Sequence, residues 1–411
     1  MKLKAALPLL AAALLLPSCS AGGNTGNPVE LVFWTTTSES ESLFFRQMIT
    51  EFENTHPNIR VTLFKKAFSS ASNEYKNAIL GGQSIDVLRA DNTWIPEYAD
   101  LDIIMPLDRL AADRELSRFV PTALSAVTYQ GQVYGLPSVM EVPALMYNKA
   151  LLKEAGYDNP PQTMDELKTM AKALSGPDRY GLYVTEDSYF ALPFVWAFGG
   201  DTVTADRKIE ISSAASQMAF AFMRELRTEG ASQPYAGFDG WYDTMMHDFG
   251  LGKAAMVING PWAVADLLKT KEFADPGNLG VAPVPKGPAG QGSPIGGHSL
   301  VINRYSEHPK ESYELISFLT SEEVQARQSL SLRTLPTRSD VYEDPRLASE
   351  YLLQSFKEPL SLARSQPMIP ESSKLYRDFT KNLNAMLLGR ESPCEGAQRI
   401  EAAWKSILKL E

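Results

Sequence analysis

One tryptophan lies in a turn, where so large a ring needs a physical reason. Trp262 belongs to GKAAMVINGPWAVADLL, residues 252–268, in which an apolar run ends on Asn-Gly-Pro-Trp and then resumes with helical spacing. Glycine and proline are enough to end a strand, so the tryptophan either fills a core or offers its ring face to a ligand. This stretch alone leaves both interpretations open.

Several acidic residues also stand at the ends of apolar runs. Glu141 lies between two such runs in residues 133–149, and a carboxylate between strands seldom belongs to a core. Asp91 and Trp94 follow another apolar run. These side chains suit a polar ligand. A pair of carboxylates drawn from Glu141, Asp187 and Asp91 could also cleave a glycosidic bond, and an exported glycosidase stays open at this point.

The motifs of other familiar enzymes are missing from the sequence. No G-x-S-x-G elbow, P-loop or G-x-G-x-x-G turn is present. The histidines are far apart and form no H-E-x-x-H pattern, so we expect them at the surface or in turns rather than on a metal. The sequence therefore predicts no catalytic residue, metal or cofactor. The four histidines are His56, His247, His298 and His308.

Length and composition favour a globular protein of more than one domain. The chain has 411 residues, above the roughly 250–300 at which single cores stop growing. It is 44% hydrophobic and 21% charged, which is ordinary for a folded protein. Its net charge of -10 argues against a nucleic-acid partner, because phosphate binding needs a basic surface.

The N-terminus has the pattern of an export signal. Residues 1–19 carry two lysines and then an apolar run too short to span a bilayer. They end on Leu-Pro-Ser-Cys, which resembles a bacterial lipobox, and this resemblance implies a lipid on Cys19 and a protein anchored to the outer face of the cell membrane. Cleavage of an ordinary signal elsewhere is the alternative. Residues 20–28 have the composition of a flexible linker, and Cys394 is expected to be structural or incidental.

The elements that must position these residues alternate between strand and helix. Such alternation is typical of an α/β protein with a parallel sheet, whose ligands lie beyond the carboxyl ends of the strands. The polar stretch TTTSESES, which contains Glu39, follows the first strand. A second set of elements begins within residues 133–149, and a third set begins near residue 279. The first strands are expected at residues 29–34, 59–64 and 85–91, with helices within 41–57 and at 75–80.

Four features together resemble the extracellular solute-binding proteins of bacterial ABC importers, in their sugar-binding group. They are the lipobox, the early strand ending Phe-Trp, Glu141 before Tyr-Asn-Lys, and GKAAMVINGPW. The resemblance implies a periplasmic-binding-protein-like α/β fold, in which two lobes joined by a hinge close on a ligand in the cleft between them. The expected lobes are residues 29–137 plus 287–330 and residues 138–286 plus 331–411.

The same resemblance implies function and partners. The expected ligand is an oligosaccharide, an α-linked disaccharide such as maltose or trehalose or a short glucan, which a monomeric protein delivers to a membrane permease without covalent chemistry. Two alternatives stay open beside the glycosidase. One is the same fold binding a glycerophosphodiester, and the other is a surface lipoprotein that binds another protein.

Site residues also follow from the resemblance. Trp262 is expected to stack on a pyranose ring, and Glu141 to accept hydrogen bonds from sugar hydroxyls. Tyr189 matches a stacking tyrosine, with Asp187 beside it, and Tyr376 falls where another stacking aromatic is expected. The alternatives are a core position for Trp262 and Tyr376, and a hinge ion pair for Glu141.

The remaining expected ligand contacts lie in loops. Asp91 and Trp94 follow the third strand, where related binders contact their ligand. Glu39 stands where a maltose-binding member of that family carries an Asp-Lys pair, so the identity of the sugar stays open. Gly297 is either a tight turn or a backbone donor to a hydroxyl or phosphate. Arg333 could bind vicinal hydroxyls or phosphate, or be a solvated surface residue.

Overall fold

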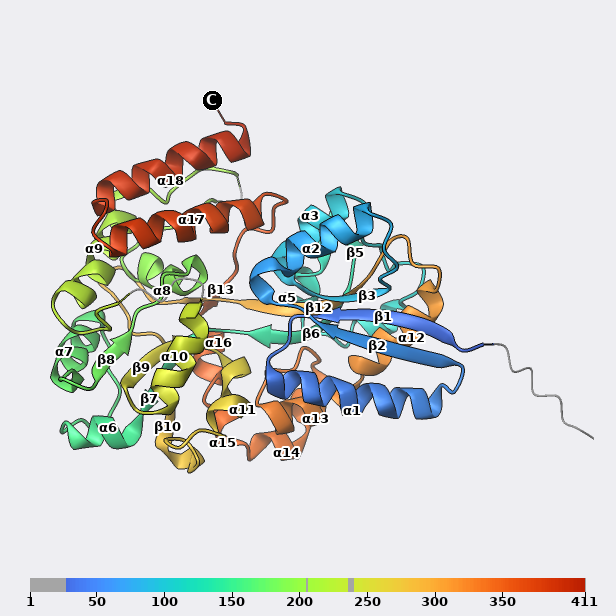
Figure 1. Cartoon of the computed structure of the whole chain (residues 1–411), viewed down its shortest axis with the longest axis horizontal. Coiled ribbons are helices and arrows are strands. Elements are labelled where there is room, and N and C mark those ends of the chain that lie inside the picture. The colour runs from blue at the N-terminus through green and yellow to red at the C-terminus, as the bar shows by residue number, and fades with distance from the viewer. Residues whose placement is uncertain (1–26, 205, 236–239, 411) are drawn as a thin grey trace, which may run out of the picture.

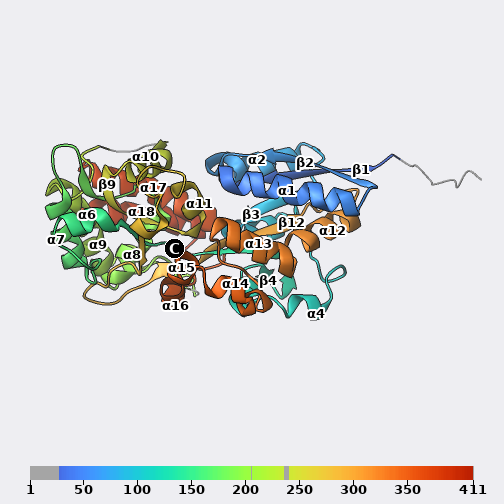
Figure 2. The same ribbon diagram turned by 90° about the horizontal axis from the view of Figure 1, so that it is seen from below.

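The chain folds into two lobes that lie side by side along the long axis of the molecule (Figure 1). This computed structural model describes residues 27–204, 206–235 and 240–410. The predicted signal, Cys19 and most of the predicted linker lie outside the described residues. The turned view shows the same two bodies, with connecting segments between them (Figure 2). No helix among the described residues is long and apolar enough to cross a membrane.

The first lobe is built on a five-stranded sheet in the order β2-β1-β3-β12-β6. β1 pairs in parallel with β2 and β3, as expected from the alternating strands and helices. β12 arrives much later in the chain and runs antiparallel between β3 and β6. The strands are β1 (Val29–Thr35), β2 (Ile59–Lys65), β3 (Val87–Asp91), β6 (Leu136–Glu141) and β12 (Gly296–Ile302), with a small hairpin of β4 (Thr128–Tyr129) and β5 (Gln132–Val133).

The helices of the first lobe cover this sheet with apolar faces. Phe44, Phe45, Met48 and Phe52 form the buried face of the first helix, at the spacing that its sequence predicts. The helices are α1 (Glu39–Thr55), α2 (Phe68–Leu80), η1 (Asn92–Trp94), α3 (Ile95–Asp100), α4 (Asp113–Leu116), α5 (Pro121–Ser125), α12 (Pro309–Leu319) and α13 (Glu322–Leu332).

The second lobe is built on a four-stranded sheet in the order β10-β7-β9-β8. β7 runs antiparallel to β10 and β9, whereas β8 is parallel to β9. The strands are β7 (Ala144–Asn148), β8 (Tyr180–Tyr183), β9 (Ala254–Asn259) and β10 (Leu279–Ala282). The helices are α6 (Lys149–Glu154), α7 (Met164–Leu174), α8 (Ser188–Ala197), α9 (Ala214–Thr228), α10 (Trp241–Gly250), η3 (Pro261–Ala263), α11 (Val264–Leu267), η4 (Pro276–Asn278), α17 (Ser372–Leu387) and α18 (Pro393–Leu408).

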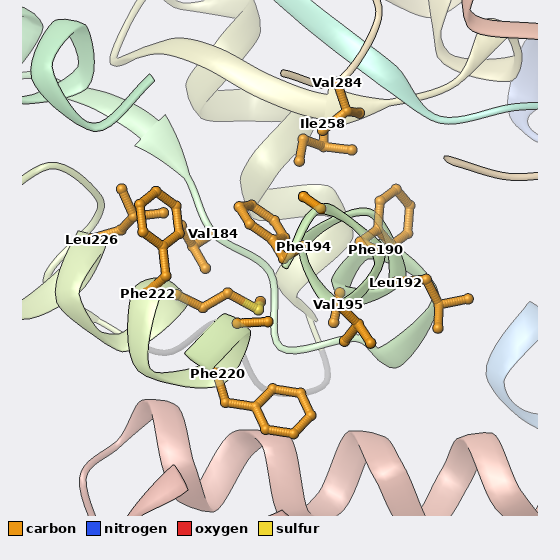
Figure 3. Packing of buried hydrophobic residues seen from close by; sticks show 14 of the residues in the cluster. Val184, Phe190, Leu192, Phe194, Val195, Phe220, Phe222, Leu226, Ile258 and Val284 are labelled. Atoms are coloured by element: carbon orange, nitrogen blue, oxygen red, sulfur yellow. The ribbon is translucent and has the colours of Figure 1, made fainter. Parts of the chain in front are cut away.

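The core of the second lobe is aromatic and surrounds α8. Figure 3 shows Phe190, Phe194 and Val195 of this helix facing the side chains of its neighbours, with Phe220 of α9 directed toward a C-terminal helix. There Phe220 meets Phe379 of α17, with 5.6 Å between ring centroids. The two last helices therefore complete the second lobe, although α13 before them packs on the first.

Three stretches of chain connect the lobes. Residues 142–143 link β6 to β7, and residues 283–295 link β10 back to β12. The third runs from α13 to α17. One apolar cluster, which includes Met140, Met146 and Leu335, lies beneath these connections and touches both lobes. The connecting elements are β11 (Ser293–Pro294), η5 (Asp340–Glu343), α14 (Pro345–Ala348), α15 (Tyr351–Gln354), α16 (Lys357–Ser361) and β13 (Ala363–Arg364).

Candidate functional site

Three strands of the first lobe place acidic and imidazole side chains next to one another. β12 lies between β3 and β6, so that His298 is directly opposite Asp91 and Gly296 directly opposite Glu141. The register shifts between His298 and Ser299, which marks a local irregularity in the strand. Three segments that are far apart in the sequence therefore supply one cluster at the end of the sheet.

Glu141 is the centre of a buried network of charges. Its Oε1 lies 3.1 Å from Nδ1 of His298 and 3.8 Å from the guanidinium of Arg89. Arg89 also donates a hydrogen bond of 2.9 Å to Glu41. Burial by itself raises the pKa of the Glu141 carboxyl, but His298 and Arg89 outweigh it and hold that pKa below its ordinary value. Glu141 therefore carries a negative charge at neutral pH.

The network is fixed to the first helix. Glu41 accepts the backbone N–H of Ser38 with its second oxygen at 2.8 Å, and the hydroxyl of Ser38 accepts the N–H of Glu41, which makes a capping box at the start of α1. The side chains of Arg89 and Glu41 are 1% and 5% exposed. Charges buried this deeply require their partners, so Arg89 is held in place by Glu41. Because Glu141 lies against Arg89, its position depends in turn on the cap of α1.

Asp91 ends β3 and caps the short helix η1. It accepts hydrogen bonds from the backbone N–H of Thr93 at 2.8 Å and from the hydroxyl of the same residue. Burial raises the pKa of Asp91, against the opposing effects of His298 and of the bonds from Thr93. The carboxylate is half-buried next to the Glu141 network.

Tyr189 joins the second lobe to this cluster. It lies in the first turn of α8, and its hydroxyl donates to the carbonyl of Pro294 at 3.4 Å. A side-chain carbon on Gly296 would stand 2.6 Å from that hydroxyl, so the tyrosine needs a glycine opposite it. Burial raises the pKa of Tyr189 well above its ordinary value, and the nearby carboxylates of Glu141 and Asp91 add to this effect. The lobes therefore meet at Tyr189.

Tyr376 approaches the same place from α17, which lies beside η1 of the first lobe. Burial raises its pKa, with further contributions from Asp201 and from Asp91. The ring is half-buried and packs against the core of the second lobe. The structure thus brings Tyr376, Tyr189, Asp91 and Glu141 together.

Trp262 is held in a fixed orientation and stays partly exposed. Its Nε1 donates to the hydroxyl of Tyr242 at 2.8 Å, and Phe190 meets its ring edge-on with 6.3 Å between centroids. A side-chain carbon on Gly260 would come within 1.8 Å of the indole, so the Asn-Gly-Pro-Trp turn needs its glycine to seat the ring. Glu41 of the first lobe is close enough to contribute to the raised pKa of Tyr242.

Two expected contacts have structural partners of their own. Asp187 caps α8 by accepting the N–H of Tyr189 at 2.9 Å, and burial raises its pKa to about 6 despite hydrogen bonds from the backbone of that helix. Trp94 is only 6% exposed. Phe68 stacks on it at 5.5 Å and is itself 53% exposed, so Phe68 presents the open aromatic face there.

Glu39, Gly297 and Arg333 have local roles that the structure makes clear. Glu39 is exposed at the start of α1 and pairs with Lys65 at 3.1 Å. Gly297 has a φ of 149°, and a side-chain carbon there would stand 2.3 Å from the carbonyl oxygen of Val139. Arg333 ends α13 in the left-handed conformation and pairs with Glu350 at 3.0 Å. The described contacts do not join Glu39 or Arg333 to the Glu141 cluster.

The prediction for His298 was wrong, and Arg89 and Phe68 were missed. His298 is 7% exposed and bonded to Glu141, whereas we expected it at the surface or in a turn. An arginine within the apolar run IDVLRAD was a usable signal, because a charged residue inside a buried strand requires a partner. For His298 no such local signal exists, since Glu141, to which it is bonded, and Asp91, opposite which it lies, come from distant segments.

The cluster has the chemistry of a site for a polar ligand with apolar ring faces. Carboxylates accept hydrogen bonds from hydroxyls, and partly exposed aromatic rings pack on C–H groups. Among the described residues, no group of three or more His, Cys, Asp or Glu side chains could hold a metal ion.

Comparison with known proteins agrees with this geometry. Residues 36–326 match the family described as bacterial extracellular solute-binding protein. The GacH receptor of Streptomyces glaucescens, solved unliganded and with acarbose, superposes with a TM-score of 0.89 at 34% identity over 93% of this chain and 99% of that one. Maltose-bound T. maritima MalE3 has a TM-score of 0.83 at 25% identity, over 92% and 100% of the two chains.

A similar relative by sequence is the maltotriose-binding protein of Pyrococcus abyssi. It is 27% identical over 359 residues, which cover 84% of this chain and 75% of the relative. The family and these neighbours are binding proteins rather than enzymes. The expected α/β fold of the periplasmic-binding-protein type is confirmed by these superpositions.

Proposed function

The chain belongs to the bacterial extracellular solute-binding proteins, and on that premise we propose that it captures an oligosaccharide between its lobes and delivers it to the permease of an ABC importer. The ligand is an α-linked disaccharide or a short glucan. Relatives that bind maltotriose, maltose and acarbose support this ligand class. The observation that carries the proposal is the close approach of Tyr189 to Gly296, directly opposite Glu141, because it sets an aromatic ring of one lobe against the carboxylates of the other.

Five residues make the proposed ligand contacts. Glu141 and Asp91 accept hydrogen bonds from sugar hydroxyls, while Trp262, Tyr189 and Tyr376 pack on ring faces. The other expected residues act around them. Asp187 orients Tyr189 through the cap of α8, Trp94 supports Phe68, and Gly297 allows β12 to approach Val139.

Ligand binding is coupled to the relative position of the lobes. The proposed hinge consists of the connections at residues 142–143, at 283–295 and beyond α13. The first proposed lobe therefore extends past the expected residue 137 to include the whole of β6. In the structure the lobes also touch where Ser40 of α1 donates a hydrogen bond to Asp266 of α11. A ligand that contacts both lobes favours the closed arrangement by its differential affinity for it.

The proposed location is the outer face of the cell membrane. Cys19 at the end of the lipobox carries the lipid, and the monomeric domain follows on a short linker. Cys19→Ala tests this part. Recovery of the variant in the soluble fraction supports the anchor, and retention in the membrane fraction contradicts it.

A sugar suits the site better than a glycerophosphodiester does. The guanidinium of Arg89 is already engaged by Glu41 and Glu141, and the neighbouring Asp91 is a third carboxyl group. A phosphate placed among these groups would meet net negative charge. A sugar hydroxyl instead finds acceptors.

Thermal unfolding with a ligand panel tests the proposal. The chain lacking residues 1–19 is melted with mono-, di- and oligosaccharides and with glycerophosphocholine. A sugar at 100 times its dissociation constant adds about 2.7 kcal/mol to the free energy of unfolding, which raises the melting temperature. A shift with glycerophosphocholine alone would replace the sugar proposal with the phosphodiester. Incubation of the protein with a glycan is a separate check. Release of product there would indicate a glycosidase.

A further inference from the structure

We propose that His298 is itself a ligand-binding residue, in which Glu141 holds Nδ1 of the imidazole while Nε2 hydrogen-bonds a sugar hydroxyl. The inference rests on the proposed function, because it adds a contact to the same site. It also adds to the Glu141 cluster a residue that discriminates between ligands, which the sequence did not indicate.

The unsatisfied nitrogen is the first argument. His298 is 7% exposed, and its Nδ1 lies 3.1 Å from Oε1 of Glu141. Its Nε2 is buried and has no hydrogen-bond partner among the described residues. A buried polar atom without a partner destabilises a protein, so such atoms are usually satisfied by protein, water or ligand. Because the two nitrogens lie on different edges of the ring, a ligand can reach Nε2 without displacing Glu141.

The surroundings of the imidazole are the second argument. His298 lies directly opposite Asp91 and two residues after Gly296, against which Tyr189 rests. Three proposed sugar contacts, Asp91, Glu141 and Tyr189, thus flank the imidazole, and Tyr189 comes from the other lobe. Phe68 meets the imidazole edge-on at 6.0 Å and is 53% exposed. A half-exposed ring can move aside without opening the core beneath it.

The chemistry of the pair suits a hydroxyl. Glu141 is ionised at neutral pH, because His298 and Arg89 hold its pKa down against burial, and it accepts the proton of Nδ1–H. The neutral imidazole then offers an acceptor at Nε2, and a protonated one offers a donor. A sugar hydroxyl can serve as the partner in either case. An apolar group at the same place would leave Nε2 unsatisfied, which would discriminate against ligands that lack a hydroxyl there.

Two substitutions distinguish contact with the ligand from a role in positioning Glu141. In His298→Asn, the amide nitrogen occupies the place of Nδ1 and keeps the partner of Glu141, but the group facing the ligand is lost. In His298→Gln, the amide nitrogen occupies the place of Nε2. His247→Asn is the matched control, because His247 lies on α10 with its side chain 64% exposed.

Affinity for the sugar identified by the panel is then measured by calorimetry. We expect His298→Asn to weaken binding about tenfold or more, His298→Gln to stay within about threefold of the unmodified protein, and His247→Asn to have no effect. The reverse order would overturn the inference in favour of a positioning role. Equal affinity in both His298 variants, whether unchanged or reduced, would overturn it as well.

A measurement on the unmodified protein covers the case in which a variant does not fold. The ¹⁵N resonances of the His298 ring are followed while sugar is added, and we expect the larger shift at Nε2. An unchanged Nε2 resonance in the saturated protein would overturn the inference alone. If the unmodified protein binds no sugar at all, the proposed function fails and this inference fails with it.

Discussion

The two lobes contribute different chemistry to the place where they meet. The first lobe supplies charged and polar groups that are already bonded to one another, namely Arg89, Glu41, Glu141 and His298. The second lobe supplies rings, of which Trp262 is held by Tyr242 and Phe190. One lobe is thus ordered by electrostatics and the other by packing.

This difference has an energetic reason. A buried carboxylate keeps its charge only if opposite charge and hydrogen bonds offset the loss of water, so the first lobe needs a network reaching back to α1. An aromatic ring needs only apolar neighbours behind it, and the core around α8 provides them. The effect on sugar affinity of substitutions in the charged network of the first lobe should therefore depend on pH. The effect of substitutions in the rings of the second lobe should not.

The largest effect is expected at the tryptophan. Trp262→Ala removes the ring that packs on the sugar, and we expect a loss of about 2 kcal/mol or more, or about 30-fold in affinity. Trp262→Phe should lose less, because it keeps an aromatic face. Calorimetric titration at pH 6 and pH 8 measures both the loss and its independence of pH.

Arg333→Ala is a suitable control for this comparison. Its guanidinium pairs with Glu350 at the end of α13, so we expect sugar affinity to be unchanged. If Trp262→Ala binds sugar as well as the unmodified protein does, the indole belongs to the core alone. The proposal that the second lobe supplies the rings that contact the ligand would then be wrong for Trp262.

A smaller effect is expected on stability, with opposite signs for two carboxyl groups. Burial raises the pKa of Asp187 to about 6, so the folded state takes up its proton before the unfolded state does, and stability rises as the pH falls through 6. Between pH 7.5 and 5 this gain amounts to about 1 kcal/mol. Glu141 has a lowered pKa, so its contribution is present above the ordinary value of 4.5 and is lost as the pH falls below it.

Denaturant unfolding of Asp187→Asn and Glu141→Gln beside the unmodified chain separates the two signs. The difference caused by Asp187→Asn should change between pH 7.5 and 5, and that caused by Glu141→Gln between pH 5 and 3.5. Parallel curves for all three proteins would contradict the opposite pKa shifts of the two carboxyl groups. The sugar affinity of Glu141→Gln tests separately whether Glu141 contacts the ligand.

Local patterns were sufficient to predict the general fold and to single out several residues of the candidate site. The alternation of strand and helix indicated the α/β class, and NGPW and Glu141 before Tyr-Asn-Lys indicated the family, which the comparisons confirm. Trp262 and Glu141 are conspicuous because their residue types are unusual for a turn and for a strand end, whereas Tyr189 was indicated by the family resemblance alone. Such signals are contained within a few neighbouring residues.

The contacts that hold the residues of the candidate site in place could not be predicted in the same way. The contact between Glu141 and His298 joins residues 157 positions apart, and nothing near either residue indicates the other. Burial raises the pKa of Asp187 against the hydrogen bonds of the α8 cap, and the depth of that burial is decided by the elements packed around the helix start. Both features depend on contacts between residues that are far apart in the chain. A pattern within a few neighbouring residues does not indicate such contacts.

The position of β12 in the chain also has a consequence for how the protein folds. Its Ser299 bonds to Asn92 across 207 residues, and β12 separates β3 from β6 in the first sheet. Until the ribosome has made that strand, β3 has a free edge and the sheet cannot close. Contacts so far apart in sequence slow folding and prolong the time during which strand edges are open to aggregation. Slow closure of the first lobe would suit a polypeptide that has to stay unfolded until it has crossed a membrane.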